Sequence, residues 1–233
     1  MADLLLLLET SGEQCSVAIA QLEGTTQKVL AEAEHTVPMK HTAMLLPLIK
    51  EAFAKTPYTL QETSAVAVST GPGSYTALRA GYSSAKGLCL ALDIPMITVS
   101  TLKAATSSAL AIKTDWSGEI IAILPARRKD VYFARFNQQL DTLIAPVCVE
   151  ANEEWWEEQL KDSSTMLVGP TVEQLTEDHD LRVTHLTVSL KASNLLAVAA
   201  MKYRAKDFAD TSSVEPNYVK PPFITQAKPR FGS

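Results

Sequence analysis

The block most able to do chemistry runs from Ser69 to Gly81, where glycines end a β-like segment and a helix-forming segment follows. Unpaired N–H groups at a helix start can bind an anion, and glycines let a ligand approach the backbone. Gly71, Gly73 and Ser74 are therefore candidates for a phosphate or nucleotide site. The alternative is a tight strand-to-helix turn only, because a glycine-rich turn without further signature residues is a weak motif.

The two common phosphate-binding motifs do not fit this block. A P-loop needs Lys and then Ser or Thr directly after its last glycine, whereas Gly73 is followed by Ser74 and Tyr75. A dinucleotide fingerprint lies in the first strand–helix unit and has an acidic partner after the next strand, and the block meets neither condition. Neither a Walker NTPase nor a Rossmann enzyme is expected.

Other reactive residue types have ordinary explanations. Ser74 and Thr76 have no histidine placed to activate them, and helix capping accounts for both. Arg79 could reach an anion or pair with Glu9, or it could be a solvated or interface arginine. The basic run at residues 127–129 is typical of a solvated hairpin tip, with contact to RNA or a partner as the alternative.

Composition indicates a globular protein with a substantial core, since 46% of the 233 residues are hydrophobic and 20% are charged. The net charge of −5 and the pI near 5.4 argue against an independent nucleic-acid binder, so contact with RNA would need a partner. Residues 4–8 are too few for a membrane span and lack the basic flank of a signal peptide. Three dispersed cysteines, Cys15, Cys89 and Cys148, indicate neither disulfides nor zinc, as expected in the cytoplasm.

Hydrophobic patterning predicts the elements that hold these residues. Strands are expected at 4–8, 15–19, 27–33, 65–69 and 95–99, and helices at 42–55, 74–91 and 101–112, the last capped by Ser100. This βββαβαβ order favours an α/β fold with parallel pairing after an initial meander.

Helical periodicity is lost after residue 112, so a second lobe is expected there. Further strands are predicted at 119–124, 131–136, 145–150 and 165–168. An acidic surface helix at 153–160 should pack Trp155 or Trp156 inward, and Ser193 should cap a helix at 194–204. Residues 221–233 are expected to form a loose tail.

The helix after the glycines is rich in small residues. Ala77, Gly81 and Ala85 lie at i, i+4 and i+8, with Ala80 and Ser84 close by, so one side allows another element to approach closely. That element is either the protein's own sheet or a partner helix. Because glycine inside a helix costs about 1 kcal/mol relative to alanine, Gly81 and Gly87 each indicate a close contact that requires glycine.

Several motifs together resemble the TsaB (YeaZ) family. They are Leu8-Glu9-Thr10-Ser11, Cys15-Ser16-Val17-Ala18, His41-Thr42 with Leu45-Leu46-Pro47, the 71–81 block, and the stretch 95–102. The Gly-Pro-Gly block is highly specific. The second lobe matches more weakly, through Ala126-Arg127-Arg128 with Val131-Tyr132 and through Pro216-x-Tyr218.

The resemblance implies an ASKHA fold, related to actin, hexokinase and ribonuclease H, with an N-terminal lobe at 1–112 and a smaller lobe at 113–233. It implies a cytoplasmic role in making threonylcarbamoyladenosine beside the tRNA anticodon. The protein would be a noncatalytic scaffold or activator that dimerises with the paralogue TsaD, joins the ATPase TsaE, forms a homodimer when alone, and meets tRNA only through the complex. The implied interface comprises His41, Leu45, Ala77, Arg79, Ala80, Gly81, Ser84 and Ala85.

The resemblance also places a tentative anion or nucleotide site at Glu9, Thr10, Ser11, Gly71, Gly73 and Ser74. No cofactor of the chain's own is expected, although a nucleotide could lie at the interface of the complex. Glu9 stands where ASKHA nucleotide binders carry Asp, and Pro125 stands where the second-lobe motif begins with Asp. The catalytic paralogue binds metal through His-x-x-x-His, whereas this chain has only His41 there, so neither catalytic nor metal-binding residues are expected.

Two other classes of function stay open. One is an enzyme, either an ASKHA-type ATP-dependent phosphotransferase or a glycoprotease-like protein. The other is a dimer that binds peptides or unrelated partners.

Overall fold

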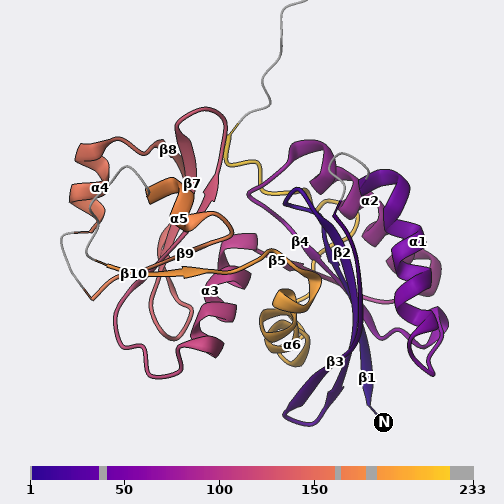
Figure 1. Ribbon diagram of the computed structural model, residues 1–233. Coiled ribbons are helices and arrows are strands. Elements are labelled where there is room, and N and C mark those ends of the chain that lie inside the picture. Colours follow the sequence, from indigo (N-terminus) through magenta and orange to yellow (C-terminus); the bar gives the residue numbers. More distant parts are fainter. Residues whose placement is uncertain (1, 37–40, 161–163, 177–182, 221–233) are drawn as a thin grey trace, which may run out of the picture.

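The computed structural model describes residues 2–36, 41–160, 164–176 and 183–220 of the chain. Two five-stranded sheets stand side by side, and helices lie outside each sheet and between them (Figure 1). Residues 221–233, where a loose tail was expected, lie outside the described part.

The first sheet has the order β3-β2-β1-β4-β5. Strands β1 (Asp3–Glu9), β2 (Cys15–Glu23) and β3 (Thr26–His35) form an antiparallel meander, and β4 (Ala65–Ser69) and β5 (Met96–Val99) pair in parallel beyond β1. The predicted meander and the parallel extension are confirmed.

Both faces of this sheet are covered, which explains the unbroken leucine run of β1. Leu4, Leu6 and Leu8 pack toward α1 (His41–Ala54) and α2 (Tyr75–Leu92), whereas Leu5 and Leu7 pack toward α6 (Leu196–Arg204). Since successive side chains of a strand point to opposite faces, a strand buried on both faces must be apolar throughout.

The second sheet has the order β10-β9-β6-β7-β8. Its strands are β6 (Ile120–Pro125), β7 (Asp130–Phe136), β8 (Thr142–Glu150), β9 (Met166–Gly169) and β10 (Thr184–Thr187). Helix α3 (Thr101–Ile112) covers one face, while α4 (Glu153–Gln159) and α5 (Val172–Thr176) cover the other. As predicted, a tryptophan of α4 packs inward: Trp156 is 1% exposed.

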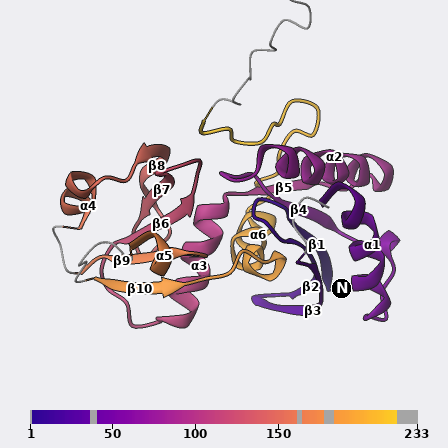
Figure 2. The same ribbon diagram turned by 45° about the horizontal axis from the view of Figure 1, so that its top comes forward.

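In the middle layer, between the two sheets, each half of the chain supplies a helix that packs on the sheet of the other half. Helix α3 belongs to the N-terminal half but packs on the second sheet, and α6 belongs to the C-terminal half but packs on the first (Figures 1 and 2). The sequence boundary at residue 112 therefore coincides with the end of α3, whereas packing does not follow that boundary.

After α6 the chain returns to the first sheet as an extended segment, residues 209–220, called the strap below (Figure 2). The Ala209 amide donates to the Met96 carbonyl at 2.8 Å, and the Asn217 amide donates to the Thr70 carbonyl at 2.8 Å. The strap thus reaches the turn between β4 and α2.

Two local predictions were wrong or incomplete. Ser193 does not cap a helix, because it lies inside a 3-10 turn (Ala192–Leu195) and its amide and hydroxyl donate to the Glu32 carboxylate at 2.8 and 3.0 Å. The short elements β10 and α5 were not predicted. Ser100, by contrast, caps α3 as expected, with its hydroxyl accepting from the Lys103 amide.

Candidate functional site

The residues of the tentative anion site do come together in the fold. Strand β1 pairs in parallel with β4, so both carboxyl ends meet at one edge of the sheet. The Thr10 amide donates to Ser69 Oγ at 3.3 Å, and the Ser74 amide donates to the Ser11 carbonyl at 2.8 Å. Residues 9–11 therefore lie directly against the Gly-Pro-Gly turn.

The turn itself is packed tightly on the end of β1. A Cβ added at Gly73 would overlap the Ser11 carbonyl oxygen and lie 2.7 Å from Ser11 Cβ. Gly71 has a φ of +96°, and a Cβ there would lie 2.9 Å from Leu78 Cδ1. Both glycines are accounted for by backbone geometry and close packing, which favours the structural interpretation of the turn.

Two backbone groups of the glycine turn have partners within the chain. The Ser74 amide bonds to Ser11, and the Gly71 carbonyl accepts from the Thr101 amide at 3.0 Å. Ser74 has the extended backbone of an N-cap, but its side chain makes no capping hydrogen bond to the described residues. The expectation that this hydroxyl caps the helix was wrong, since the Ser11 carbonyl fixes the turn through the Ser74 backbone instead.

Glu9 is buried at the centre of this arrangement, with 1% of its surface exposed. Its Oε1 accepts a hydrogen bond of 2.6 Å from the Ser11 amide. Burial raises the pKa of the Glu9 carboxyl above its ordinary value, and hydrogen bonds from Ser11, Ser69 and the Thr10 amide oppose that rise. The Glu9 carboxyl is thus bonded within the chain and turned away from solvent.

Arg79 does not reach Glu9. It lies on the exposed side of α2, where its Nη1 donates to the Tyr75 hydroxyl at 2.8 Å and its guanidinium lies 5.5 Å from the Tyr75 ring centre. The Tyr75 ring also packs 4.7 Å from the ring of Tyr218 in the strap. The solvated or interface interpretation therefore describes this arginine.

The small face of α2 packs inside the chain. Ala77, Gly81 and Ala85 are buried, and a Cβ added at Gly81 would overlap Thr10 Oγ1. Leu45 of α1 is also buried, at 1% exposure. Of the predicted interface residues, these four therefore serve the chain's own core, and bulk at Ala77 or Gly81 would disturb the fold before it reached a partner.

Three further predicted interface residues are accessible. Arg79 is exposed, and Ala80 and Ser84 are half-buried on the outer side of α2. Helix α1 begins at His41, one residue before the predicted start, and the His41 side chain lies outside the described part of the structure.

The outer side of α2 carries a second set of mainly small residues. These residues, called the α2 stripe below, recur at alternating spacings of four and three; they are Thr76, Ala80, Ser83, Gly87 and Leu90. A groove of about 460 Å³ lies at its N-terminal end, lined by Tyr75, Thr76, Arg79, Ala80, Ser83 and Ser84. Leu90 is 84% exposed, and Leu46 on neighbouring α1 is 62% exposed. The close contact expected at Gly81 is present, whereas the one expected at Gly87 was not found, because no described atom lies within 4 Å of a Cβ added there.

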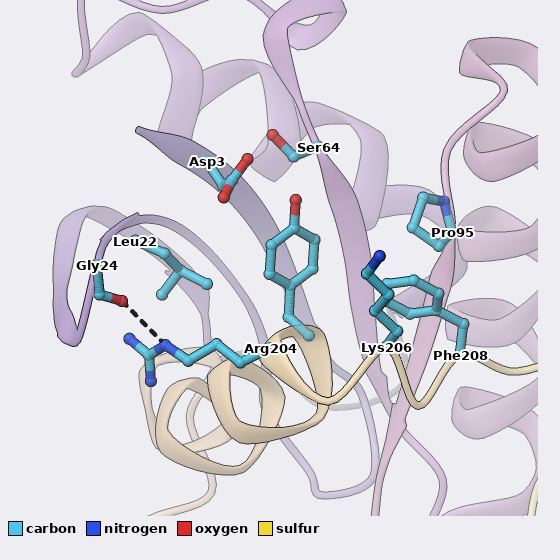
Figure 3. Close-up of a pocket in the computed structure, with 9 residues that line it drawn as sticks. Asp3, Leu22, Gly24, Ser64, Pro95, Arg204, Lys206 and Phe208 are labelled. Carbon is cyan, nitrogen blue, oxygen red and sulfur yellow. Dashed lines mark hydrogen bonds between the residues drawn. The ribbon is translucent and has the colours of Figure 1, made fainter. Parts of the chain in front are cut away.

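A hollow of about 510 Å³ lies where β1, β4 and β5 begin, at the end of the first sheet opposite the glycine turn (Figure 3). It is lined by Asp3, Leu22, Gly24, Ser64, Pro95, Tyr203, Arg204, Lys206 and Phe208. Arg204 donates to the carbonyls of Gly24, Thr25 and Thr26, so its charge is used to hold the β2–β3 turn. This hollow contains none of the predicted site residues.

Two features are absent from the described residues. They contain no group of three or more His, Cys, Asp or Glu placed to hold a metal ion. Nor do the helices in that part of the chain include one long and apolar enough to cross a membrane.

Comparisons with known proteins agree on one family. The sequence model of the family TsaD, described as tRNA N6-adenosine threonylcarbamoyltransferase, matches residues 28–219. The tRNA threonylcarbamoyladenosine biosynthesis protein TsaB of Haemophilus influenzae is 28% identical over 93% of both chains.

Solved structures agree on the fold. YeaZ from Pseudomonas aeruginosa superposes with a TM-score of 0.74 at 23% identity, covering 93% of this chain and 99% of that one. An inorganic polyphosphate/ATP-glucomannokinase from Arthrobacter sp. superposes with a TM-score of 0.50 at 12% identity, covering 88% and 99% of the two chains. Together with the two mixed sheets, these likenesses are those of an ASKHA fold.

Proposed function

Because the chain belongs to the TsaB (YeaZ) family, we propose that it is a noncatalytic scaffold or activator subunit in the synthesis of threonylcarbamoyladenosine on tRNA. It would act by pairing with a TsaD-type catalytic paralogue and by assembling with a TsaE-type ATPase. Its role in this pathway is supported by the name of its Haemophilus relative and by the TsaD-type match over most of the chain. The expected compartment is the cytoplasm.

The α2 stripe is the observation that carries the pairing proposal. Alternating spacings of four and three place its residues along one seam, as in helices that pack at a shallow angle. Its first four positions are Thr, Ala, Ser and Gly, which lets a second helix approach closely, and exposed Leu90 and Leu46 supply apolar area beside the seam. In the absence of the paralogue, the same surface would hold a homodimer.

A noncatalytic role is supported by the contacts that the polar groups near the Gly-Pro-Gly turn make within the chain. Glu9 faces Ser11 rather than solvent, Arg79 is turned to Tyr75, and the Ser74 amide is bonded within the chain. These groups stabilise the start of α2, and so the angle at which the stripe is presented. A nucleotide, if one binds, would lie at the interface of the complex, and tRNA would be held mainly by the assembled complex.

The test is to place bulk on the stripe without touching the core. Ala80→Trp should abolish co-elution with the TsaD-type subunit and self-association, because the indole would prop the helices apart. Ala111→Trp on α3 is the control, since Ala111 is exposed on a helix that packs on the second sheet rather than the first. Unchanged pairing of Ala80→Trp would contradict the proposed interface. Full modification by TsaD and TsaE without this protein would contradict the proposed function.

One observation favours a second candidate, an ASKHA-type phosphotransferase. Thr10 Oγ1 is buried beside the glycine turn and makes no hydrogen bond within the described structure, and the fold resembles that of a glucomannokinase. ATP turnover by the purified protein, lost in Glu9→Ala, would support this candidate. Absence of turnover by protein of verified fold would exclude it.

A further inference from the structure

The tip of the β6–β7 hairpin concentrates positive charge on an acidic protein. Arg127, Arg128 and Lys129 are consecutive and exposed, and nowhere else in the sequence do two Lys or Arg residues adjoin. The chain as a whole carries a net charge of −5. A polyanion would therefore be repelled by the overall field and attracted at this tip.

The backbone of the tip is unusual for a cationic residue. Arg128 has a φ of +63°, in the left-handed region that costs a non-glycine residue about 1–2 kcal/mol. The turn is closed by the Ala126 amide donating to the Asp130 carbonyl at 2.9 Å and the Asp130 amide donating to the Arg127 carbonyl at 3.2 Å. Glycine would suit position 128 better, so the arginine is not explained by the needs of the turn.

The strap neutralises the acidic residue next to the tip. Lys220 forms an ion pair with Asp130, the acidic residue next to the tip. Glu150, the strand partner of Asp130, is the other nearby carboxylate. Within the described part of the chain, the side chains of Arg128 and Lys129 enter no ion pair. Positive charge thus stays in excess and available at the tip.

The character of this surface distinguishes RNA from a protein partner. Protein interfaces are centred on buried apolar or aromatic anchors, whereas phosphates are bound by separate Lys and Arg side chains. None of the large exposed apolar side chains of the described structure lies at residues 126–130. We propose that the β6–β7 tip, with Lys220 beside it, contacts the phosphate backbone of the tRNA held by the complex. This inference rests on the proposed function.

The experiment measures tRNA affinity in the assembled complex. The probe is an unmodified, labelled transcript of a tRNA that reads codons beginning with A, titrated with the complex of this protein and its TsaD-type partner over a range of KCl concentrations. The variant combines Arg128→Gly, which suits the left-handed backbone, with Lys129→Gln. The control combines Lys28→Gln with Lys113→Gln, which remove the same charge from exposed sites on β3 and beyond the end of α3.

The tip variant should bind the tRNA about tenfold more weakly at roughly 0.1 M salt, and its plot of log affinity against log salt should be shallower by about 1.5. The control should keep the wild-type slope. Equal affinity and slope for variant and wild type, with the complex intact by co-elution, would overturn the inference and leave the proposed function standing. Loss of the ATPase subunit at unchanged RNA affinity would overturn it in favour of a protein contact. Failure of the wild type to pair with the TsaD-type subunit would overturn both.

Discussion

The contact between Gly81 and Thr10 can be tested by a pair of identical substitutions on one helix. A Cβ at Gly81 would overlap Thr10 Oγ1 and lie 3.2 Å from Thr10 Cγ2, and Thr10 is fully buried. At Gly87, six residues further along α2 and exposed, no described atom lies within 4 Å of such a Cβ. Gly81→Ala and Gly87→Ala therefore differ in packing and share the same gain in helix propensity.

The expected free energies follow from these two terms. Replacing glycine by alanine within a helix stabilises it by about 1 kcal/mol, which is the whole effect expected at Gly87. Overpacking a tight site costs about 1–3 kcal/mol, so Gly81→Ala should end near neutral or up to about 2 kcal/mol less stable than wild type. The difference between the two variants isolates the clash and should be about 1–3 kcal/mol.

Urea denaturation followed by circular dichroism would measure both free energies of unfolding. A third variant, Thr10→Ala, removes the clashing atoms and sacrifices no hydrogen bond to a described residue. In the double variant Thr10→Ala/Gly81→Ala, at least about 1 kcal/mol of the free energy lost to the clash should be recovered, which a double-mutant cycle measures. If Gly81→Ala were as stable as Gly87→Ala, the close approach of α2 to β1 would not be the reason for the glycine.

Two further predictions concern titratable groups. The folded protein keeps the proton of Glu9 to a higher pH than the unfolded chain, whose carboxyl titrates near 4.5. The free energy of unfolding should therefore fall as the pH rises above 4.5 and this group ionises. Glu9→Gln should flatten that decline in denaturation curves measured at a series of pH values. Burial raises the pKa of Cys15 to about 12 and of Cys89 to about 11, so a thiol reagent at pH 8 should modify half-buried Cys148 first in the native protein, and rapid labelling of Cys15 would refute this.

Local patterns predicted the elements that are buried on a regular face. The leucine run of β1 and the alternation in β2 could be interpreted from sequence, because the hydrophobicity of each residue indicates whether the sheet face it points to is covered. Strand β10 carries no such signal, since Thr184–Thr187 is only partly buried and polar at both ends. Helix α5 has five residues, too few for a helical period to stand out.

Long-range contacts decided the predictions that failed. Ser193 has the residue type of a cap, but Glu32, distant in sequence, takes its hydrogen bonds. The small residues of α2 indicated a close approach by either the sheet or a partner helix, and only the fold shows that Gly81 lies against Thr10 and that Ala77 and Ala85 are buried within the chain. The sequence pattern gives the spacing of residues around a helix, but it does not identify the element that packs against them.

The exchange of α3 and α6 in the middle layer bears on how this protein could be divided. A fragment ending at residue 112 would leave the apolar face that receives α6 uncovered, including Leu5 and Leu7, and would carry α3 with no second sheet to pack on. The complementary fragment would have the opposite defect. Each half supplies a helix that the sheet of the other half needs, so neither half is expected to fold alone, and the two sheets should unfold as one cooperative unit.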